Sequence, residues 1–381
     1  MTKPLEGVRV LELARVLAGP WIGQTMADLG ADVIKVEAPG GDETRGWGRP
    51  LPPHGASSYF HSCNRGKRSI ALDFRDPEDL RTVRALAREA DVLLENFKVG
   101  GLKKFALDHP TLSAANPRLI TCSVTGFGQD GPRAPQAGYD FIIQAMGGIM
   151  DLTGEPDGEP QKPGVAYADL FTGLYGVIAV QAALLLREKT GLGQHIDMSL
   201  FDTQLAVLAN QASSYLMTGE VPKRMGNTHP SIVPYQVFHA ADGPLVIACG
   251  NDGQFVRLSE ALGAGFHRDP RFRTNNDRLE HRDALVALLE DRLAAMPRGD
   301  VIAAMEAAGV PAGPINNVGE AFSDPQAEFR GMAIPLDGHR GVRTPIRATG
   351  MELSLDRPAP GLDADGADIH AALRHAAGWP D

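Results

Sequence analysis

Apolar and polar positions alternate over several short runs in the first half of the chain, and helical patterns separate most of these runs. An alternating, β-branched run predicts a β-strand over 8–13, and further strand-like runs predict strands over 31–37, 69–74, 91–97, 119–124 and 194–200. Helical patterns cover 21–29, 76–90, 139–150 and 201–216. A strand, a helix and a second strand within about 30 residues are typical of a parallel βαβ unit. We therefore predict an α/β fold with a large Rossmann-like parallel-sheet domain.

The pattern changes near Thr218, where a polar and turn-rich stretch over 221–230 indicates a linker. Beyond it, strand patterns at 232–238 and 245–249 precede helical patterns at 255–262, 282–296 and 299–308. Strand-like sequence returns near Met332, and a last helix is predicted near 367–377. The predicted domains are 1–217 for the first part of the large domain, 218–330 for the linker and a smaller α+β domain, and 331–381 for the return to the large domain.

One acidic residue, Asp169, lies at the start of a long helical pattern. The stretch 164–176 leads into the apolar segment 177–186, and together they predict one helix with a carboxylate at its N-terminal edge. Aspartate is a preferred N-cap, because its carboxylate accepts hydrogen bonds from the first unpaired N–H groups. The helix dipole also keeps such a carboxylate ionised, and an ionised carboxylate can serve as a nucleophile. The residues alone leave both interpretations open.

The composition narrows the class of protein. With 43% hydrophobic and 22% charged residues among 381, the chain is typical of soluble globular proteins. Its longest apolar run is shorter than the roughly 20 residues of a membrane span, and residues 1–7 carry no signal or transit pattern. A net charge of −10 argues against general nucleic-acid binding. We therefore expect a cytoplasmic protein that binds neither nucleic acid nor membrane.

The cysteines and the common catalytic motifs offer little further chemistry. Cys63, Cys122 and Cys249 lie far apart, and their spacing suggests neither a disulfide framework nor a zinc site. Each fits a small buried residue in a reducing compartment, and a catalytic thiol stays open as the alternative. The motifs G-x-S-x-G and H-E-x-x-H do not occur. We therefore predict no metal site.

Basic residues gather in two islands of this acidic chain. Residues 44–72 contain no acidic residue but hold Arg45, Arg49, Arg65, Lys67 and Arg68, and a second island holds Lys98, Lys103 and Lys104. Such islands can bind a phosphate-bearing ligand or can be solvated faces. The second island follows the strand pattern at 91–97, where ligands of open α/β sheets bind. The fingerprint G-x-G-x-x-G is missing, which disfavours a nicotinamide or flavin site.

Several stretches, in order along the chain, resemble the class III coenzyme A-transferase family, which also includes α-methylacyl-CoA racemases. They are LARVLAGP (13–20), DLGADVIKVE (28–37), NRGKRS (64–69), ENF (95–97), TGFG (125–128), ADL (168–170) and GVPAGP (309–314). A narrower likeness, to the family's succinyl-CoA–glutarate transferases, rests on HPSIVPYQ (229–236), GNDGQF (250–255) and GPINN (313–317). The likeness runs through essentially the whole chain.

The resemblance implies that Asp169 is the catalytic nucleophile. Its carboxylate would attack an acyl-CoA thioester to give a mixed anhydride, and the released thiolate would then form an aspartyl-CoA thioester. Coenzyme A would pass to another carboxylic acid, so a CoA thioester is a substrate and no tightly bound cofactor is expected. The family also implies an interlocked homodimer. The narrower likeness points to succinyl-CoA as the donor and a dicarboxylate as the acceptor.

The resemblance also implies binding positions. The CoA-binding residues would be Arg15, Val16, Leu72, Arg75, Asn96, Phe97, Lys98, Lys104 and Tyr139. The candidate oxyanion and substrate loop consists of Gly250, Asn251, Asp252 and Gly253, whose backbone N–H groups are suitable donors. His229 and Ser231 are candidate substrate residues, and Arg15, Arg45 and Arg133 are further candidates for the second carboxylate.

Two positions bear on the details of this assignment. Family racemases carry a His in the stretch that reads Gly138-Tyr139-Asp140 here, and tyrosine, with a pKa of about 10, is a poor base near neutral pH. We therefore favour a transferase over a racemase. Relatives often carry Arg where Ala38 stands, and Arg45 is a candidate to take over its contact with the CoA nucleotide. An alternative of another class is a non-catalytic CoA-binding protein.

Overall fold

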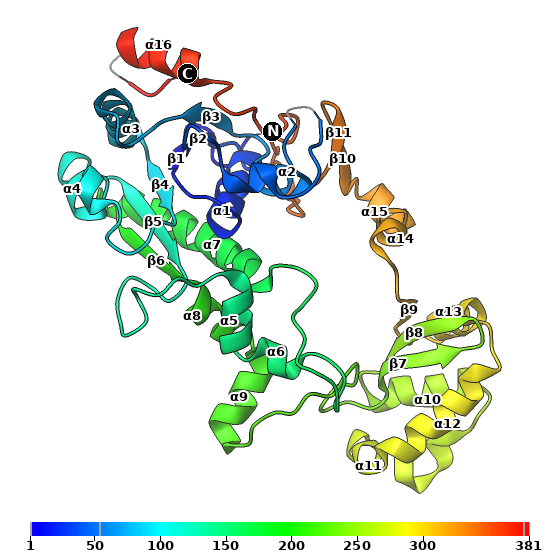
Figure 1. Ribbon diagram of the computed structural model, residues 1–381. Coiled ribbons are helices and arrows are strands. Elements are labelled where there is room, and N and C mark those ends of the chain that lie inside the picture. The colour runs from blue at the N-terminus through cyan, green and yellow to red at the C-terminus, as the bar shows by residue number, and fades with distance from the viewer. Residues whose placement is uncertain (1, 53–54, 376–377, 381) are drawn as a thin grey trace. The chain divides into compact units, whose positions relative to one another are not determined.

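The computed structural model describes residues 2–52, 55–375 and 378–380, and the chain divides into two compact units (Figure 1). The first unit comprises Met1–Met150, Lys162–Glu220 and Pro325–Asp381, and the second comprises Asp151–Gln161 and Val221–Asp324. The segment Asp151–Gln161, which the sequence pattern assigns to the large domain, is thus grouped with the second unit.

A six-stranded sheet forms the centre of the first unit, in the order β3-β2-β1-β4-β5-β6. Its strands are β1 (Arg9–Glu12), β2 (Asp32–Glu37), β3 (Arg68–Ala71), β4 (Val92–Glu95), β5 (Ile120–Thr125) and β6 (His195–Ser199). All neighbouring pairs are parallel. The predicted α/β class and all six predicted strands are confirmed. This order is that of doubly wound folds, whose ligands bind where the order reverses, here between β1 and β4.

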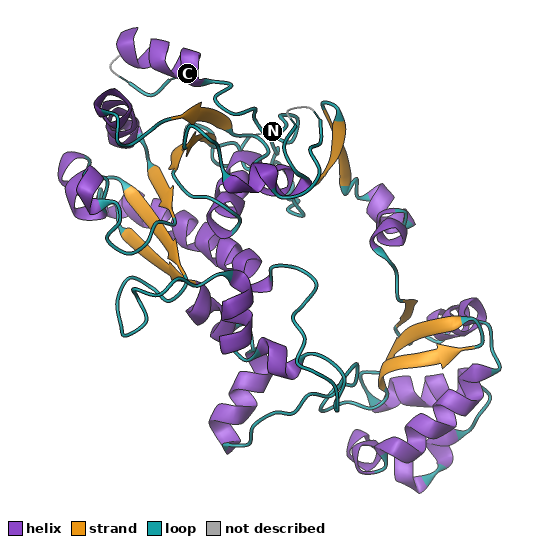
Figure 2. Cartoon of the chain, viewed as in Figure 1, coloured by secondary structure: helices purple, strands orange, loops and turns teal. Residues whose placement is uncertain are grey.

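Helices cover both faces of the sheet (Figure 2). One face packs against α1 (Ala18–Asp28) and α7 (Tyr167–Thr190), and the other against α3 (Pro77–Glu89), α4 (His109–Ala115) and α16 (Gly366–His375). The remaining helices of this unit are α2 (Ser58–Cys63), α5 (Asp140–Met146), α8 (Leu200–Ala206), α9 (Ala209–Thr218) and α15 (Pro325–Phe329), while α6 (Ile149–Leu152) spans the chain boundary between the units. Successive strand residues point to opposite faces, so the neighbours Val10 and Leu11 are buried in different layers.

Helices α1 and α7 approach closely, and two glycines of α7 make this possible. A Cβ atom at Gly176 would lie 2.4 Å from Cδ1 of Ile22, and one at Gly173 would lie 3.0 Å from Cβ of Trp21. A larger residue at Gly176 would displace the Ile22 side chain from this contact. The first turn of α7, which carries Asp169, is therefore held against the start of α1.

Helix α7 is also the one described helix that is long and apolar enough, by length and composition alone, to cross a membrane. The length of the longest unbroken apolar run in the sequence does not identify this helix, because polar residues interrupt the apolar positions of α7. The core helix of a soluble protein passes the same test. In this structure Ala168, Val177, Val180 and Leu184 of α7 belong to the core cluster of the first unit. We interpret α7 as a partly buried core helix of a soluble enzyme fold.

The second unit is built around a three-stranded antiparallel sheet in the order β7-β8-β9. Its strands are β7 (Tyr235–Ala240), β8 (Gly243–Ala248) and β9 (Ala312–Pro314), and its helices are α10 (Asp252–Ala261), α11 (Asn275–Glu280), α12 (Arg282–Ala294), α13 (Arg298–Ala307) and α14 (Val318–Phe322). Phe238, Phe255 and Leu289 are fully buried in its core. The Arg224 guanidinium ties the segment 151–161 to this unit by donating to the carbonyls of Asp151, Glu155 and Gly158, each at 2.9 Å.

The C-terminal segment returns to the first unit and covers the edge strand β3. It forms the antiparallel hairpin β10 (Ala333–Leu336) and β11 (His339–Val342) before it reaches α16. The carboxylates of Asp365 and Asp363 accept hydrogen bonds from the backbone N–H groups of Ser69 (2.8 Å) and Ala71 (2.9 Å). The last predicted helix is confirmed as α16 up to its end at residue 375, and residues 376–377 of that prediction lie outside the described residues.

Two stretches that the sequence pattern predicts as single long helices each form two shorter helices. The pattern 201–216 forms α8 and α9 with a break between them, and the backbone at Ala209 has φ +48°. The pattern 139–150 forms α5 and α6, and Gly148 between them has φ +85°. A positive φ is incompatible with a continuous right-handed helix. Apolar periodicity survives such breaks, which explains why the sequence pattern does not reveal them.

Candidate functional site

A cavity of about 740 Å³ opens at the carboxyl ends of the parallel strands, within the first unit. Residues that follow β1, β2, β3, β4 and β5 all line it, together with the starts of α5 and α7. The cavity therefore lies where the strand order reverses, the expected position in a doubly wound fold. Its size suits a ligand larger than a simple carboxylic acid, since drug-sized ligands occupy roughly 300–1,000 Å³.

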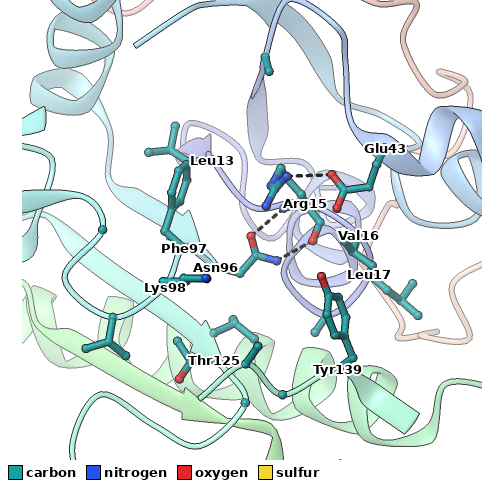
Figure 3. Close-up of a pocket in the computed structure, with 18 of the residues that line it drawn as sticks. Leu13, Arg15, Val16, Leu17, Glu43, Asn96, Phe97, Lys98, Thr125 and Tyr139 are labelled. Atoms are coloured by element: carbon teal, nitrogen blue, oxygen red, sulfur yellow. Dashed lines mark hydrogen bonds and ion pairs between the residues drawn. The ribbon is translucent and has the colours of Figure 1, made fainter. Parts of the chain in front are cut away.

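This cavity brings together the predicted residues of the first unit. Its lining includes Asp169 and all the implied CoA positions, namely Arg15, Val16, Leu72, Arg75, Asn96, Phe97, Lys98, Lys104 and Tyr139. They come from five different strand ends and helix starts, so no local sequence pattern places them side by side. Figure 3 shows Phe97, Asn96 and Lys98 on one side of the cavity and Val16, Leu17 and Tyr139 on the other.

The turn after β1 is fixed to the turn after β4 by a reciprocal pair of hydrogen bonds (Figure 3). The backbone N–H of Arg15 donates to Oδ1 of Asn96 at 2.9 Å, and Nδ2 of Asn96 donates to the carbonyl of Arg15 at 2.6 Å. The Arg15 guanidinium donates to Oε2 of Glu43 at 2.8 Å. Asn96 therefore orders the backbone of the cavity, while Arg15 keeps a partly exposed charge at its wall.

Asp169 lies in the first turn of α7 but does not cap it. The N-cap position belongs to Ala166, and the N–H groups of Ala168 and Asp169 donate to Oδ1 of Asp140 at 2.9 and 3.3 Å. The interpretation of Asp169 as an N-cap is therefore wrong, because Asp140 supplies the capping carboxylate from α5. In the described part of the chain, the Asp169 carboxylate receives no hydrogen bond and forms no ion pair.

The unpaired state of Asp169 changes its acidity. Its exposed fraction is 9%, and burial, together with the nearby Asp140 carboxylate, raises the pKa of Asp169 to about 7. The sequence pattern suggests the opposite, namely that the helix dipole keeps this carboxylate ionised. The first N–H groups of α7 are already engaged by Asp140, and desolvation outweighs what remains of the dipole. Asp169 is thus a carboxylate poised to change its charge near neutral pH.

Two glycines bring Tyr139 and Asp140 to the end of β5. A Cβ atom at Gly126 would lie 2.4 Å from the Cα atom of Gly138, so the two backbones touch. This contact holds the start of α5 beside the cavity. Tyr139 precedes α5, is largely exposed, and points from the cavity rim toward the turn that contains Val16 (Figure 3).

Cationic and aromatic side chains line the part of the cavity near β3 and β4. Lys98 and Lys104 lie there, as does Arg75, whose guanidinium is paired with the Asp73 carboxylate at 2.7 Å. The rings of Phe74 and Phe97 are stacked with centroids 6.3 Å apart, and Phe105 meets Phe74 edge-on. Phosphate groups and an aromatic base are the ligand parts that match such a surface.

Two other arginines considered from the sequence do not line this cavity. Arg45 donates to both carboxylate oxygens of Glu37, at 2.6 and 2.7 Å, and its guanidinium lies 3.7 Å from the centroid of the Phe60 ring. Arg45 is therefore engaged with Glu37 and Phe60, and its contact with the CoA nucleotide stays a prediction. Arg133 donates to Gln136 at 3.1 Å and is exposed outside the cavity lining.

The remaining predicted residues belong to the second unit. The N–H of Ser231 donates to Nδ1 of His229 at 3.0 Å, and the His229 ring lies 5.1 Å from that of Tyr235. In the loop Gly250–Gly253, the N–H of Gly250 donates to the side chain of Gln254 at 2.7 Å. Asn251 is the N-cap of α10, and Asp252 is paired with Arg278 at 2.8 Å.

Some residues near Asp169 are not found by sequence reasoning. Burial, and after it the Asp169 charge, raises the pKa of the Tyr59 hydroxyl. The Tyr59 ring meets Trp47 edge-on at 5.2 Å. Both lie in the Gly/Pro-rich segment after β2, whose turn-rich composition has no periodic pattern from which side-chain contacts could be predicted. Cys63, Cys122 and Cys249 are free and buried, as predicted, and the described residues contain no group of three or more potential metal ligands.

Comparison with known proteins identifies the family. Residues 5–366 match the model of CoA-transferase family III. The chain therefore belongs to this family, and it is a class III CoA-transferase.

Individual relatives align along nearly the full length of the chain. A succinate–glutarate CoA-transferase from Agrobacterium fabrum is 51% identical over 97% of this chain and 96% of that protein. An acetyl-CoA:oxalate CoA-transferase from Acetobacter aceti is 43% identical over 96% of this chain and 95% of that protein. The crystal structure of a CAIB/BAIF family protein from Brucella suis is 58% identical, covers 98% of this chain and 100% of that chain, and has a TM-score of 0.90.

Proposed function

We propose that this class III CoA-transferase moves coenzyme A from succinyl-CoA to a second dicarboxylic acid, with Asp169 as the covalent nucleophile. The observation that supports this most is a buried, unpaired carboxylate in the same cavity as every implied CoA position of the first unit. The Agrobacterium relative is named for succinate and glutarate, and the Acetobacter relative for acetyl-CoA and oxalate. The acceptor acids in both names carry two carboxylates, which favours a dicarboxylate here.

The proposed reaction proceeds through covalent forms of Asp169. The carboxylate attacks the thioester carbonyl, the C–S bond breaks, and CoA thiolate leaves a mixed anhydride. The thiolate attacks the aspartyl carbonyl of the anhydride, releasing the donor acid and forming an aspartyl-CoA thioester. The acceptor carboxylate then attacks the aspartyl carbonyl of this thioester, which breaks the C–S bond, expels CoA thiolate and forms a second mixed anhydride between Asp169 and the acceptor acid. Attack of the thiolate on the acceptor acyl group yields the new acyl-CoA and regenerates the Asp169 carboxylate.

The environment of Asp169 favours each forward acylation. Its carboxylate is desolvated and lies near a second carboxylate, so the charged resting form is held at high free energy. An anhydride or a thioester at Asp169 is neutral and is free of that electrostatic cost. Burial therefore raises the reactivity of the nucleophile, provided that the pH is high enough to ionise it.

The second carboxylate of each substrate requires its own partner. Of the three arginines considered for the second carboxylate (Arg15, Arg45 and Arg133), Arg15 is the one that lines the cavity. We propose that Arg15 contacts the acyl-CoA, and that His229 and Ser231 contact the second carboxylate. Gly250, Asn251, Asp252 and Gly253 are proposed to donate to the tetrahedral oxyanions, which requires the Gly250 N–H to leave Gln254.

We also propose that two copies of the chain interlock into a homodimer in the cytoplasm. One side of α7 carries Leu174, Ile178 and Leu185, with exposed fractions of 46%, 60% and 71%. Residues spaced by four and seven lie along one helix face. A second copy that covers this stripe would bury it, and light scattering of the purified protein would give the mass of a dimer.

Hydroxylamine trapping tests the covalent mechanism. The protein is incubated with succinyl-CoA and a panel of other acyl-CoAs, hydroxylamine is added, and the peptide that contains Asp169 is examined by mass spectrometry. A hydroxamate at Asp169 is expected, since hydroxylamine cleaves anhydrides and thioesters. Asp140→Asn is the matched control, because it alters the neighbouring carboxylate and leaves the nucleophile in place, and its adduct should persist.

Three other outcomes would contradict the proposal. No adduct with any acyl-CoA, despite measurable CoA binding, would indicate a non-catalytic binding protein. Exchange of the α-proton of an acyl-CoA in deuterated water, without an acceptor acid, would indicate a racemase. An adduct on a residue other than Asp169 would show that this other residue is the nucleophile. A mass-spectrometric screen of succinyl-CoA against an acid library would then identify the acceptor.

A further inference from the structure

The turn after β1 contains an unusual backbone conformation. Val16 has φ +72°, in the left-handed region, and it is part of the cavity lining. For a β-branched residue this conformation is a genuine outlier, because its Cβ substituents crowd the following carbonyl. Such a conformation persists only where the surrounding structure imposes it. The contacts around Val16 therefore need to supply a restraint.

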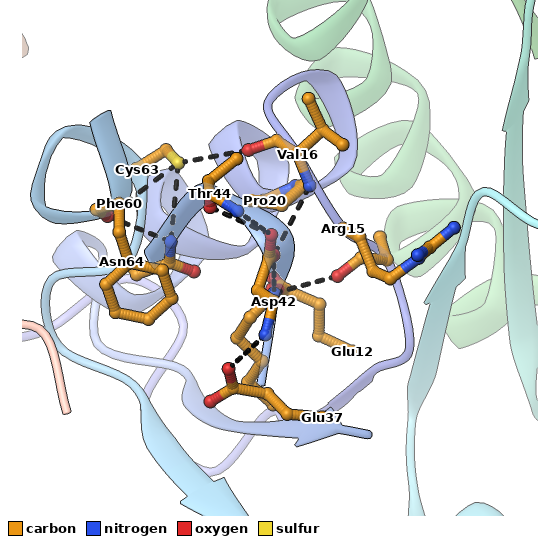
Figure 4. A network of polar contacts seen from close by, with 12 residues as sticks. Glu12, Arg15, Val16, Pro20, Glu37, Asp42, Thr44, Phe60, Cys63 and Asn64 are labelled. Atoms are coloured by element: carbon orange, nitrogen blue, oxygen red, sulfur yellow. Dashed lines mark hydrogen bonds and ion pairs between the residues drawn. The ribbon is translucent and has the colours of Figure 1, made fainter. Parts of the chain in front are cut away.

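Two buried side chains restrain the turn on both sides of Arg15. The ammonium group of Lys35 donates to the carbonyl of Ala14 at 2.8 Å. The backbone N–H of Val16 donates to Oδ2 of Asp42 at 3.3 Å. Lys35 and Asp42 pair with each other at 3.0 Å. One ion pair therefore binds two backbone groups of the turn, the carbonyl of Ala14 and the N–H of Val16. Figure 4 shows the Asp42 carboxylate beside the Val16 backbone.

Further buried charges hold this ion pair in place. The Glu12 carboxylate lies 3.2 Å from Nζ of Lys35 and 2.8 Å from Nζ of Lys67, and all three side chains have no exposed surface. Oδ1 of Asp42 accepts hydrogen bonds from the N–H and the hydroxyl of Thr44 at 3.0 and 2.8 Å. Asp42 and Lys35 therefore cannot move independently of the sheet, and neither has room to release the turn.

Stability alone does not explain this network. Desolvating several charges is costly, and well-packed apolar residues of similar volume often stabilise a protein as well or better. An apolar cluster cannot form hydrogen bonds with a backbone carbonyl and a backbone N–H and so cannot fix their geometry. The position of the network, directly behind the cavity wall, indicates that this geometry is its contribution.

We propose that Asp42 and Lys35 are positioning residues for acyl-CoA binding, which rests on the proposed function of the cavity. Their ion pair holds the turn at Val16 in its strained conformation, so that the backbone after β1 lies along the bound CoA. Neither side chain contacts the ligand. Both act through the shape of the turn.

A set of six proteins tests this by separating the strain at residue 16 from its side chain. Val16→Gly and Val16→Ala both remove the isopropyl group, but only glycine adopts φ +72° without strain. Each is made in the native background and with Asp42→Asn, and the dissociation constant of free CoA is measured for all of them, the native protein and Asp42→Asn included. CoA binding does not require turnover, so the result does not depend on covalent chemistry at Asp169.

The glycine and alanine variants of Val16 should differ in CoA affinity in the Asp42→Asn background and not in the native background. In the native background the two Val16 variants should bind CoA with dissociation constants within about twofold, because the ion pair imposes the turn on both. With Asp42→Asn alone, binding should weaken about tenfold. In that background Val16→Gly should bind at least about fivefold more tightly than Val16→Ala, since the left-handed conformation disfavours alanine by that factor or more.

Two results would overturn the proposal. If the glycine and alanine variants bind CoA equally in the Asp42→Asn background, the network merely stabilises the fold. If the native protein does not bind CoA at all, the proposed function fails and this inference fails with it. Should Asp42→Asn not fold, Thr44→Val replaces it, because it removes one hydrogen bond to Asp42 and keeps the charge pair. The same difference between glycine and alanine, smaller in size, is then required.

Discussion

Two buried aspartates, Asp169 in the cavity lining and Asp42 behind the cavity wall, have opposite electrostatics. Asp42 and Asp169 have exposed fractions of 2% and 9%. Burial raises the pKa of both carboxyls, but at Asp42 the Lys35 charge and the Thr44 hydrogen bonds outweigh it and leave the pKa below its usual value. At Asp169 the Asp140 carboxylate adds to the effect of burial, and the pKa rises to about 7.

The comparison shows that the partner, and not the depth of burial, decides what a buried carboxylate does. Asp42 is permanently charged and fixes a backbone turn. Asp169 is held without a cation and is reactive. A lysine beside Asp169 would lower its pKa and stabilise the anion, which would make it a poorer nucleophile. The buried ammonium group of Lys35 pairs with Asp42 at 3.0 Å, whereas Asp169 forms no ion pair among the described residues.

Removing the reactive carboxylate should have the largest effect. Asp169→Ala is expected to lower kcat/KM for CoA transfer by at least about a thousandfold, because no covalent intermediate can form. The decisive measurement is isotope exchange from labelled succinate into succinyl-CoA without a second acid. Exchange in the variant at more than a few per cent of the native rate would show that another group carries the acyl chain.

Removing the structural cation should affect the fold more than the chemistry. Lys35→Met leaves the buried carboxylates of Asp42 and Glu12 without this partner and should reduce the free energy of unfolding by about 3–5 kcal/mol. Lys103→Met is the matched control at an exposed lysine outside the cavity lining, and it should change stability by less than about 0.5 kcal/mol. Urea denaturation of both variants measures the difference, and equal stabilities would contradict the structural role of Lys35.

The raised pKa of Asp169 should make the two aspartates respond differently to pH. The folded protein holds the Asp169 proton more tightly than the unfolded chain does, so this contribution to stability is present below about pH 4 and is lost as the pH rises to about 7. The slope approaches at most about 1.4 kcal/mol per pH unit. The free energy of unfolding of the native protein and of Asp169→Asn, measured by denaturation from pH 4 to 8, gives this contribution as the difference between the two proteins. Parallel curves for the two proteins would mean that the Asp169 pKa is not raised.

The smallest expected effect concerns the neighbour of Asp169. Asp140→Asn keeps an oxygen that can cap α7 but removes the charge that adds to burial at Asp169. The acid limb of the pH profile of kcat/KM should therefore move to lower pH, by less than about one unit. A shift to higher pH would show that Asp140 acts mainly through the helix cap.

The sequence predicts the sheet well and the electrostatics poorly. Short runs rich in apolar and β-branched residues locate every strand of the large sheet, because helices cover both faces and each strand needs apolar side chains on both. The family resemblance places Arg15, Asn96 and Asp169 in one cavity. It does not reveal that Asp140 takes the cap of α7, since that depends on where α5 meets α7 in space. The breaks within the long helical patterns also go unseen, because apolar periodicity continues across them.

The Lys35–Asp42 pair illustrates the same limit. Lys35 lies within an alternating strand, where a charged residue would ordinarily be assigned to a solvated face. Its partners Glu12 and Asp42 come from β1 and from the loop after β2. Their meeting requires the parallel register of β1 and β2, in which Glu12 is paired with Lys35. The register follows from the fold and cannot be obtained from the local sequence.

The two carboxylates that cover β3 have a consequence for how the protein is made. Asp363 and Asp365 accept hydrogen bonds from the N–H groups of an edge strand that the ribosome completes much earlier. Until Asp363 and Asp365 are synthesised, the N–H groups of β3 that bind them have no partner. An edge strand with unpaired N–H groups favours aggregation. Most of the second unit is one continuous stretch and can be completed sooner. A nascent chain that stalls before its last residues should need chaperone protection of its first unit.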